Sequence, residues 1–87
     1  MKPVFRQYLA LKREIPGGAV LLTRIGPHYR SFGPSGENGL SIPVGKIGEG
    51  IGRLVSTGLT VALADYAEAP RPGRLVRREI TRIFSPA

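Results

Sequence analysis

The sequence has no cysteine and no tryptophan, and among its 87 residues it holds one histidine and six acids. Without cysteine the chain can form neither a disulfide nor a thiolate metal site, and this fits a reducing compartment. The single His28 has no acid close to it in the sequence and makes a poor metal ligand alone. No apolar run approaches the roughly 18 residues of a membrane span. We therefore expect a cytoplasmic protein with no metal, cofactor or membrane association.

The acidic residues are too few and too scattered to suggest catalysis. They lie in different predicted elements without a repeated spacing: Glu14, Glu37, Glu49, Asp65, Glu68 and Glu79. No nucleophile, base and orienting group can be assembled from them and His28. Residues 39–47 superficially suggest a phosphate-binding loop, but the glycines are one residue too far apart and Ile47 replaces the required Ser or Thr. We predict that the chain is not an enzyme.

Basic residues, in contrast, are abundant. Thirteen Lys and Arg against six acids give a formal charge of +7, and ten of the thirteen are Arg, whose guanidinium binds phosphate in a bidentate manner. Five arginines lie within twelve residues: Arg71, Arg74, Arg77, Arg78 and Arg82. We predict that they form a strip that contacts nucleic-acid phosphates. The alternatives are a solvated face whose arginine stems cover apolar surface, or a docking surface for an acidic protein.

The length and the hydrophobic pattern predict one α/β domain over residues 1–87. Apolar residues recur at helical spacing over residues 3–14, and a continuous apolar run over 19–25 is typical of a strand buried on both faces. Residues 26–39 are rich in glycine and proline and are predicted to be a surface loop. A brief strand is expected at residues 40–42.

The second half of the chain repeats this alternation. A helix is predicted over residues 46–57, weakened by three glycines and ended by Gly58, followed by a strand over 59–66 and a connection over 67–73. Residues 74–84 are ambiguous, because their apolar positions fit one face of a helix better than the alternation of a strand.

Taken in order, these segments resemble the N-terminal, mismatch-recognition domain of the MutS DNA-repair family. Residues 5–12 resemble its Q-Y-x-x-L-K helix, and residues 20–32 resemble an apolar strand ending in R-M-G-D-F-Y-E-x-F. Later matches include Ile42-Pro43, Arg53-Leu54-Val55, Val61-Ala62, Arg82-Ile83 and Ser85-Pro86. The resemblance implies a mixed β-sheet flanked by two helices, with a strand as the last element. We adopt that strand for residues 74–84 in place of the helix.

The resemblance also implies a mechanism that this sequence has altered. In the family, a phenylalanine wedges beside the mispaired base and a glutamate two residues later hydrogen-bonds it. The corresponding positions here are His28 and Arg30, a smaller aromatic ring and a donor-only cation. The loop that follows is shorter than in the family and lacks a helix found there. We do not expect the ATPase activity of MutS in these 87 residues, because the resemblance covers only its N-terminal domain.

These observations predict a small basic DNA-binding module, nucleoid-associated if it binds DNA, that contacts nucleic acid mainly through phosphates. The alternative is a protein-interaction module that reuses the same fold. The oligomeric state is not determined by the sequence.

Overall fold

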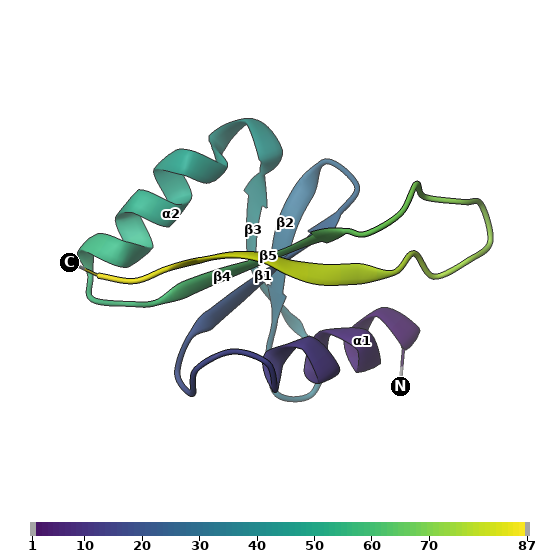
Figure 1. Cartoon of the computed structure of the whole chain (residues 1–87), viewed down its shortest axis with the longest axis horizontal. Coiled ribbons are helices and arrows are strands. Elements are labelled where there is room, and N and C mark those ends of the chain that lie inside the picture. Colours follow the sequence, from purple (N-terminus) through teal and green to yellow (C-terminus); the bar gives the residue numbers. More distant parts are fainter. Residues whose placement is uncertain (1, 87) are drawn as a thin grey trace.

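The computed structural model describes residues 2–86, which form a five-stranded β-sheet with one helix on each face (Figure 1). This confirms the predicted fold. No helix within the described residues is long and apolar enough to cross a membrane. The elements are, in chain order, α1 (Pro3–Lys12), β1 (Val20–Ile25), β2 (His28–Phe32), β3 (Asn38–Pro43), the 3-10 helix η1 (Val44–Lys46), α2 (Ile47–Ser56), β4 (Val61–Tyr66) and β5 (Arg78–Phe84).

The sheet is mixed, with strand order β3-β2-β1-β4-β5. The central strands β1 and β4 are parallel, with Val20 opposite Val61, while the other pairs are antiparallel. Parallel neighbours end at the same edge of a sheet. The turn after β1 and the connection of residues 67–77 after β4 therefore leave the sheet from one edge.

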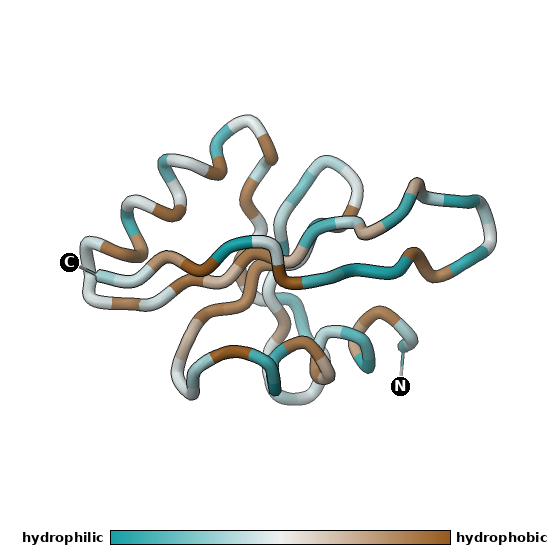
Figure 2. Tube along the Cα trace, in the orientation of Figure 1, coloured by the Kyte–Doolittle hydropathy of each residue, from teal (hydrophilic) through white to brown (hydrophobic). Residues whose placement is uncertain are grey.

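Two hydrophobic cores lie on opposite faces of the sheet. Successive residues of a strand point to opposite faces, so the fully buried Leu21 packs under α1 while the fully buried Leu22 packs under α2. Along the trace in Figure 2, the first residues of β1 and β4 are therefore mostly hydrophobic in colour, while Arg24 and Asp65 lie near the ends of these strands. The α1 core includes Phe5, Tyr8, Leu11, Ala62 and Ala64, and the α2 core includes Tyr29, Ile51, Val61 and Leu63.

The predicted surface loop at residues 26–39 is wrong, because it contains β2 and the start of β3. Gly26 has φ of +57° and Pro27 follows it, so positive φ occurs only at the first central position, as in a type II′ hairpin turn. This turn brings β2 back antiparallel to β1. The glycine and proline content hid the alternation of β2, in which Tyr29 faces one core and Phe32 contributes to the other.

The last element is a strand, as the resemblance implied, and the helical periodicity was misleading. Leu63 pairs with Arg82 but Ala64 pairs with Ile80, so the ladder has an irregularity around Thr81. Ile80 therefore packs on the α1 core while Phe84 packs on the α2 core. Apolar residues therefore lie on both faces of β5, and one extra residue shifts their register. Their spacing in the sequence resembles that of a helix for this reason. The connection before β5 is longer than predicted and extends to residue 77.

The end of α2 is as the sequence predicted. Gly58 has φ of +91°, and its N–H donates to the Val55 carbonyl at 3.0 Å while Leu59 N–H donates to the Leu54 carbonyl at 3.2 Å. This is a Schellman arrangement, which needs glycine at the left-handed position.

The three glycines inside α2 have different surroundings, and this predicts different effects of alanine. A Cβ at Gly52 would meet nothing within 4 Å, whereas one at Gly50 would lie 2.7 Å from Ile42 Cδ1. We expect Gly52→Ala to raise the free energy of unfolding by about 1 kcal/mol through helix propensity. Gly50→Ala should raise it less or lower it, as measured by urea unfolding. Equal gains in the two variants would contradict the close packing of α2 on β3.

Candidate nucleic-acid interface

Arg78, one of the predicted phosphate contacts, is instead a buried structural residue. It is 9% exposed, and its Nε donates to the carbonyl oxygen of Arg24 at 2.7 Å. Its Nη1 donates to Gln7 Oε1 at 2.7 Å and to the Val76 carbonyl at 3.2 Å. The guanidinium carbon lies 5.1 Å from the centre of the Tyr66 ring. Burial lowers the pKa of Arg78, but a guanidinium remains protonated in proteins, so the charge is held inside by these partners.

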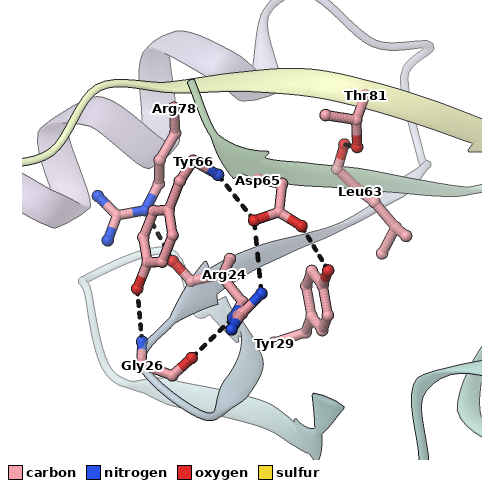
Figure 3. A network of polar contacts seen from close by, with 8 residues as sticks. All are labelled: Arg24, Gly26, Tyr29, Leu63, Asp65, Tyr66, Arg78 and Thr81. Carbon is pink, nitrogen blue, oxygen red and sulfur yellow. Dashed lines mark hydrogen bonds and ion pairs between the residues drawn. The ribbon is translucent and has the colours of Figure 1, made fainter. Parts of the chain in front are cut away.

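A second set of contacts, centred on Asp65, lies beside Arg78 (Figure 3). The hydroxyl of Tyr29 donates to Asp65 Oδ2 at 2.6 Å, and the backbone N–H of Tyr66 donates to Oδ1 at 2.8 Å. Arg24 Nη1 lies 3.7 Å from the same Oδ1. Burial raises the pKa of Tyr29, and the hydrogen bond and negative charge of Asp65 raise it further. Strands β1, β2 and β4 are thereby joined through their side chains.

These contacts also hold the turn between β1 and β2. The N–H of Gly26 donates to the Tyr66 hydroxyl at 2.7 Å, and Arg24 Nε donates to the Gly26 carbonyl at 2.7 Å (Figure 3). Both backbone polar groups of Gly26 are therefore bonded to side chains of the sheet. The turn that immediately precedes His28 is fixed in place.

His28 and Arg30 lie on β2 and not in a loop. His28 pairs with Ile25 and Pro43, and Arg30 pairs with Thr23 and Ser41. Because they alternate with Tyr29, which packs on the α2 core, their side chains point to the α1 face. Both residues are partly exposed, and Arg30 Nε is buried without a hydrogen-bond partner among the described residues. The sheet thus presents a donor-rich pair beside the fixed turn.

The remaining arginines of the predicted strip are divided between two places. Arg71, Arg74 and Arg77 are exposed on the connection of residues 67–77, which we call the arm and which projects from the body of the molecule (Figure 1). Arg82 is also exposed, but it pairs with Leu63 and lies 5.1 Å from the Phe84 ring, on the α2 face. One continuous strip therefore does not exist.

The structure brings the arm together with basic residues that the sequence analysis did not single out. Gln7 of α1 donates to the Val76 carbonyl at 2.9 Å, which joins the arm to this helix. Along α1, Lys2, Arg6 and Arg13 are exposed at spacings that put them on one side of the helix. A search for cations at helical spacing would have found them.

We call the exposed cations of α1, its flanking residues and the arm the basic side; they are Lys2, Arg6, Lys12, Arg13, Arg71, Arg74 and Arg77, of which Lys12 lies over the Tyr8 ring. Over residues 2–86 the one ion pair is that of Arg24 with Asp65, so the seven cations have no carboxylate partner within the described part of the chain. In the same part there is no group of three or more side chains able to hold a metal ion.

The chain aligns along almost its full length with curated bacterial proteins described as "DNA mismatch repair protein MutS". The identity is 36% for the protein of Anaplasma phagocytophilum, 34% for that of Chlorobaculum tepidum and 30% for that of Anaeromyxobacter sp. strain K, with 97% of this chain covered in each. The chain spans only 12–13% of the length of these relatives. No protein-family model matches it.

The chain is thus similar to a short region of MutS. The alignments extend over 104 to 107 positions although the chain has 87 residues, so the MutS proteins carry insertions relative to it. This agrees with the expected shortening of the chain.

Residues that match the MutS motif and residues that differ from it have different roles in the structure. Of the positions that match the motif, Arg24, Gly26 and Tyr29 make contacts that fix the turn and its strands, and Phe32 packs on the α1 core. Of the positions that differ, Pro27 lies in the turn, and His28 and Arg30 point to the α1 face. The residues of the motif that support the turn are thus retained, while His28 and Arg30 differ from it.

Replacing Arg78 should test its structural role. Arg78→Met keeps the stem but leaves the Arg24 carbonyl and Gln7 Oε1 without their donor, so we expect the free energy of unfolding to fall by about 2–3 kcal/mol. The neighbouring exposed Arg77→Met should change it by less than about 0.5 kcal/mol. Urea unfolding measures both. Equal effects would show that the Arg78 guanidinium is not structural.

The raised pKa of Tyr29 predicts a loss of stability at alkaline pH. Below about pH 10 the tyrosine is protonated in both states, so its full contribution is present. As the pH rises through the folded-state pKa, the unfolded chain has already released the proton and the contribution is lost. Tyr29→Phe should cost about 1 kcal/mol at pH 7 and reduce the alkaline loss. An unchanged pH dependence of unfolding in this variant would argue against the Asp65 contact.

Proposed function

We propose that the chain is a DNA-binding module of the MutS type that holds DNA chiefly through its phosphates. The observation that carries this proposal is the basic side, where seven cations without carboxylate partners gather on α1, its flanks and the arm. Only Glu14 and Glu68 lie on the same segments, and Glu68 Oε2 is engaged by the backbone N–H of Arg77. Such a surface attracts a polyanion through counterion release.

Recognition of a mispaired base is not part of this proposal. The position of the phenylalanine wedge holds the smaller His28, and Arg30 offers donors where the family has an acceptor. Bending a duplex costs roughly 1–6 kcal/mol, which a 9.4 kDa domain has little contact area to offset. His28 can still stack on an exposed base, and Arg30 can reach a phosphate or a guanine edge. The module should therefore bind with weak sequence preference.

A second candidate, a protein-interaction module, is favoured by a groove of about 330 Å³ between β3 and α2. Its lining includes Ile42 and Leu54, and Leu40 at its rim is 43% exposed on the edge strand of the sheet. A protein partner would be recovered by pull-down after nuclease treatment, whereas a DNA-binding module would recover none. Substitution of Leu40 by Ser would then abolish the recovery.

Salt dependence is the direct test of the DNA-binding proposal. If about four phosphates are neutralised, log affinity for a duplex should fall against log salt with a slope near −3.6. The measurement is a fluorescence anisotropy titration of matched, G·T-mispaired and single-stranded oligonucleotides at several salt concentrations. Matched and mispaired duplexes should bind within about threefold of each other, because no wedge and acceptor pair distinguishes them.

Charge-removal variants locate the contacts. Arg6→Ala with Arg13→Ala should reduce the salt slope by about 1.8, since two phosphate contacts are lost. Arg53→Ala, on the exposed side of α2, is the matched control and should leave the slope unchanged. A flat salt dependence, or no binding at low salt, would contradict the proposal.

A further inference from the structure

The tip of the arm is a rigid turn that holds two arginines together. Arg74 N–H donates to the Arg71 carbonyl at 3.3 Å, and Gly73 between them has φ of +73°. Proline at the second position and a left-handed glycine at the third are the signature of a type II turn, whose end Cα atoms lie within about 7 Å. Arg71 and Arg74 occupy these two ends.

The base of the arm is anchored, so the tip has a fixed direction. Ala67 N–H donates to the Arg77 carbonyl at 2.8 Å, which extends the β4–β5 ladder by one pair. Val76 is buried, and its carbonyl accepts from both Gln7 and Arg78. In Figure 1 the arm extends away from the body on the side opposite to the end of α2, and Figure 2 shows it as largely hydrophilic.

The side chains at the tip of the arm are suited to binding an anion. Arg71 and Arg74 are exposed and have no carboxylate partner among the described residues, and like charges held this close favour an anionic environment between or around them. Leu75 beside them is 48% exposed. The arm has no Asn or Gln, the side chains that read adenine in the major groove, and arginine there reads guanine, so a preference of this arm for A·T pairs would have to arise in the minor groove.

We propose that the arm inserts its tip into the minor groove of duplex DNA, with Arg71 and Arg74 in the groove and Leu75 against its sugar walls. The proposal rests on the DNA-binding function above and adds a preference to it. A·T-rich DNA has a narrow minor groove with enhanced negative potential, which attracts inserted arginine. Binding should therefore be tighter to any duplex whose minor groove resembles that of A·T pairs, whichever groups its major groove presents.

Inosine separates the two grooves experimentally. An I·C pair lacks the guanine amino group of the minor groove, like A·T, but keeps the hydrogen-bonding pattern of G·C in the major groove. We compare three duplexes of equal length, composed of A·T, G·C or I·C pairs, in anisotropy titrations with the full chain at low salt. The A·T and I·C duplexes should bind about tenfold more tightly than the G·C duplex.

Two variants connect the preference to the arm. Arg71→Ala with Arg74→Ala should reduce the tenfold preference to about twofold or less, and both substitutions are at exposed positions outside the sheet. Arg6→Ala with Arg13→Ala is the matched control and should weaken binding to all three duplexes by the same factor. Unchanged circular dichroism would show that all variants are folded.

The outcomes separate this inference from the proposed function. Equal, salt-dependent binding to all three duplexes would overturn minor-groove insertion and leave phosphate binding intact. Binding in which I·C behaves like G·C would indicate major-groove reading and would also overturn it. Absence of binding to every duplex at low salt would overturn both.

Discussion

The arrangement of this domain depends on one buried cation. The Arg78 guanidinium contacts β1 through the Arg24 carbonyl, α1 through Gln7, the base of the arm through Val76 and β4 through the Tyr66 ring. The Arg24 carbonyl and Gln7 Oε1 each accept a hydrogen bond from this guanidinium, and leaving polar groups unpaired is costly in a protein interior. Together with the hydrogen bond from Gln7 to the Val76 carbonyl, Arg78 thereby holds the helix, the arm and the central strands to one another at this edge of the sheet.

The parallel pairing of β1 with β4 determines which segments lie together at this edge of the sheet. It puts the Gly26-Pro27 turn and the arm side by side in the fold, and the Gly26 to Tyr66 hydrogen bond connects them. Among the residues that fix this edge, Arg24, Gly26 and Tyr29 match the MutS motif, whereas His28 and Arg30 do not. The domain thus retains the residues that support the turn and carries His28 and Arg30 beside it. Phosphate attraction, which needs charge but little precise geometry, suits such a surface.

Much of the fold was predictable from the sequence, because α1 and α2 have apolar residues at helical spacing and β1 and β4 begin with short apolar runs. The strand β2 was not, since glycines and prolines surround its five residues and outweighed the alternation of Tyr29 with polar neighbours. The burial of individual arginines was even harder to predict from the sequence. Arg77 and Arg78 are neighbours of identical charge in the sequence, and only the position of Arg78 opposite Tyr66 across two strands buries one and leaves the other exposed. Charge composition therefore could not show which arginines are buried and which are exposed.

The account is tested most directly by mapping the DNA-binding surface with nuclear magnetic resonance of the ¹⁵N-labelled chain. On addition of a duplex, the amide signals of the arm and the Nε–Hε signals of Arg6, Arg71 and Arg74 should shift most. The Nε–Hε signal of Arg78 should stay in place, because that proton is bonded to the Arg24 carbonyl. Shifts centred on α2 and the edge strand β3, with an unaffected arm, would contradict the account.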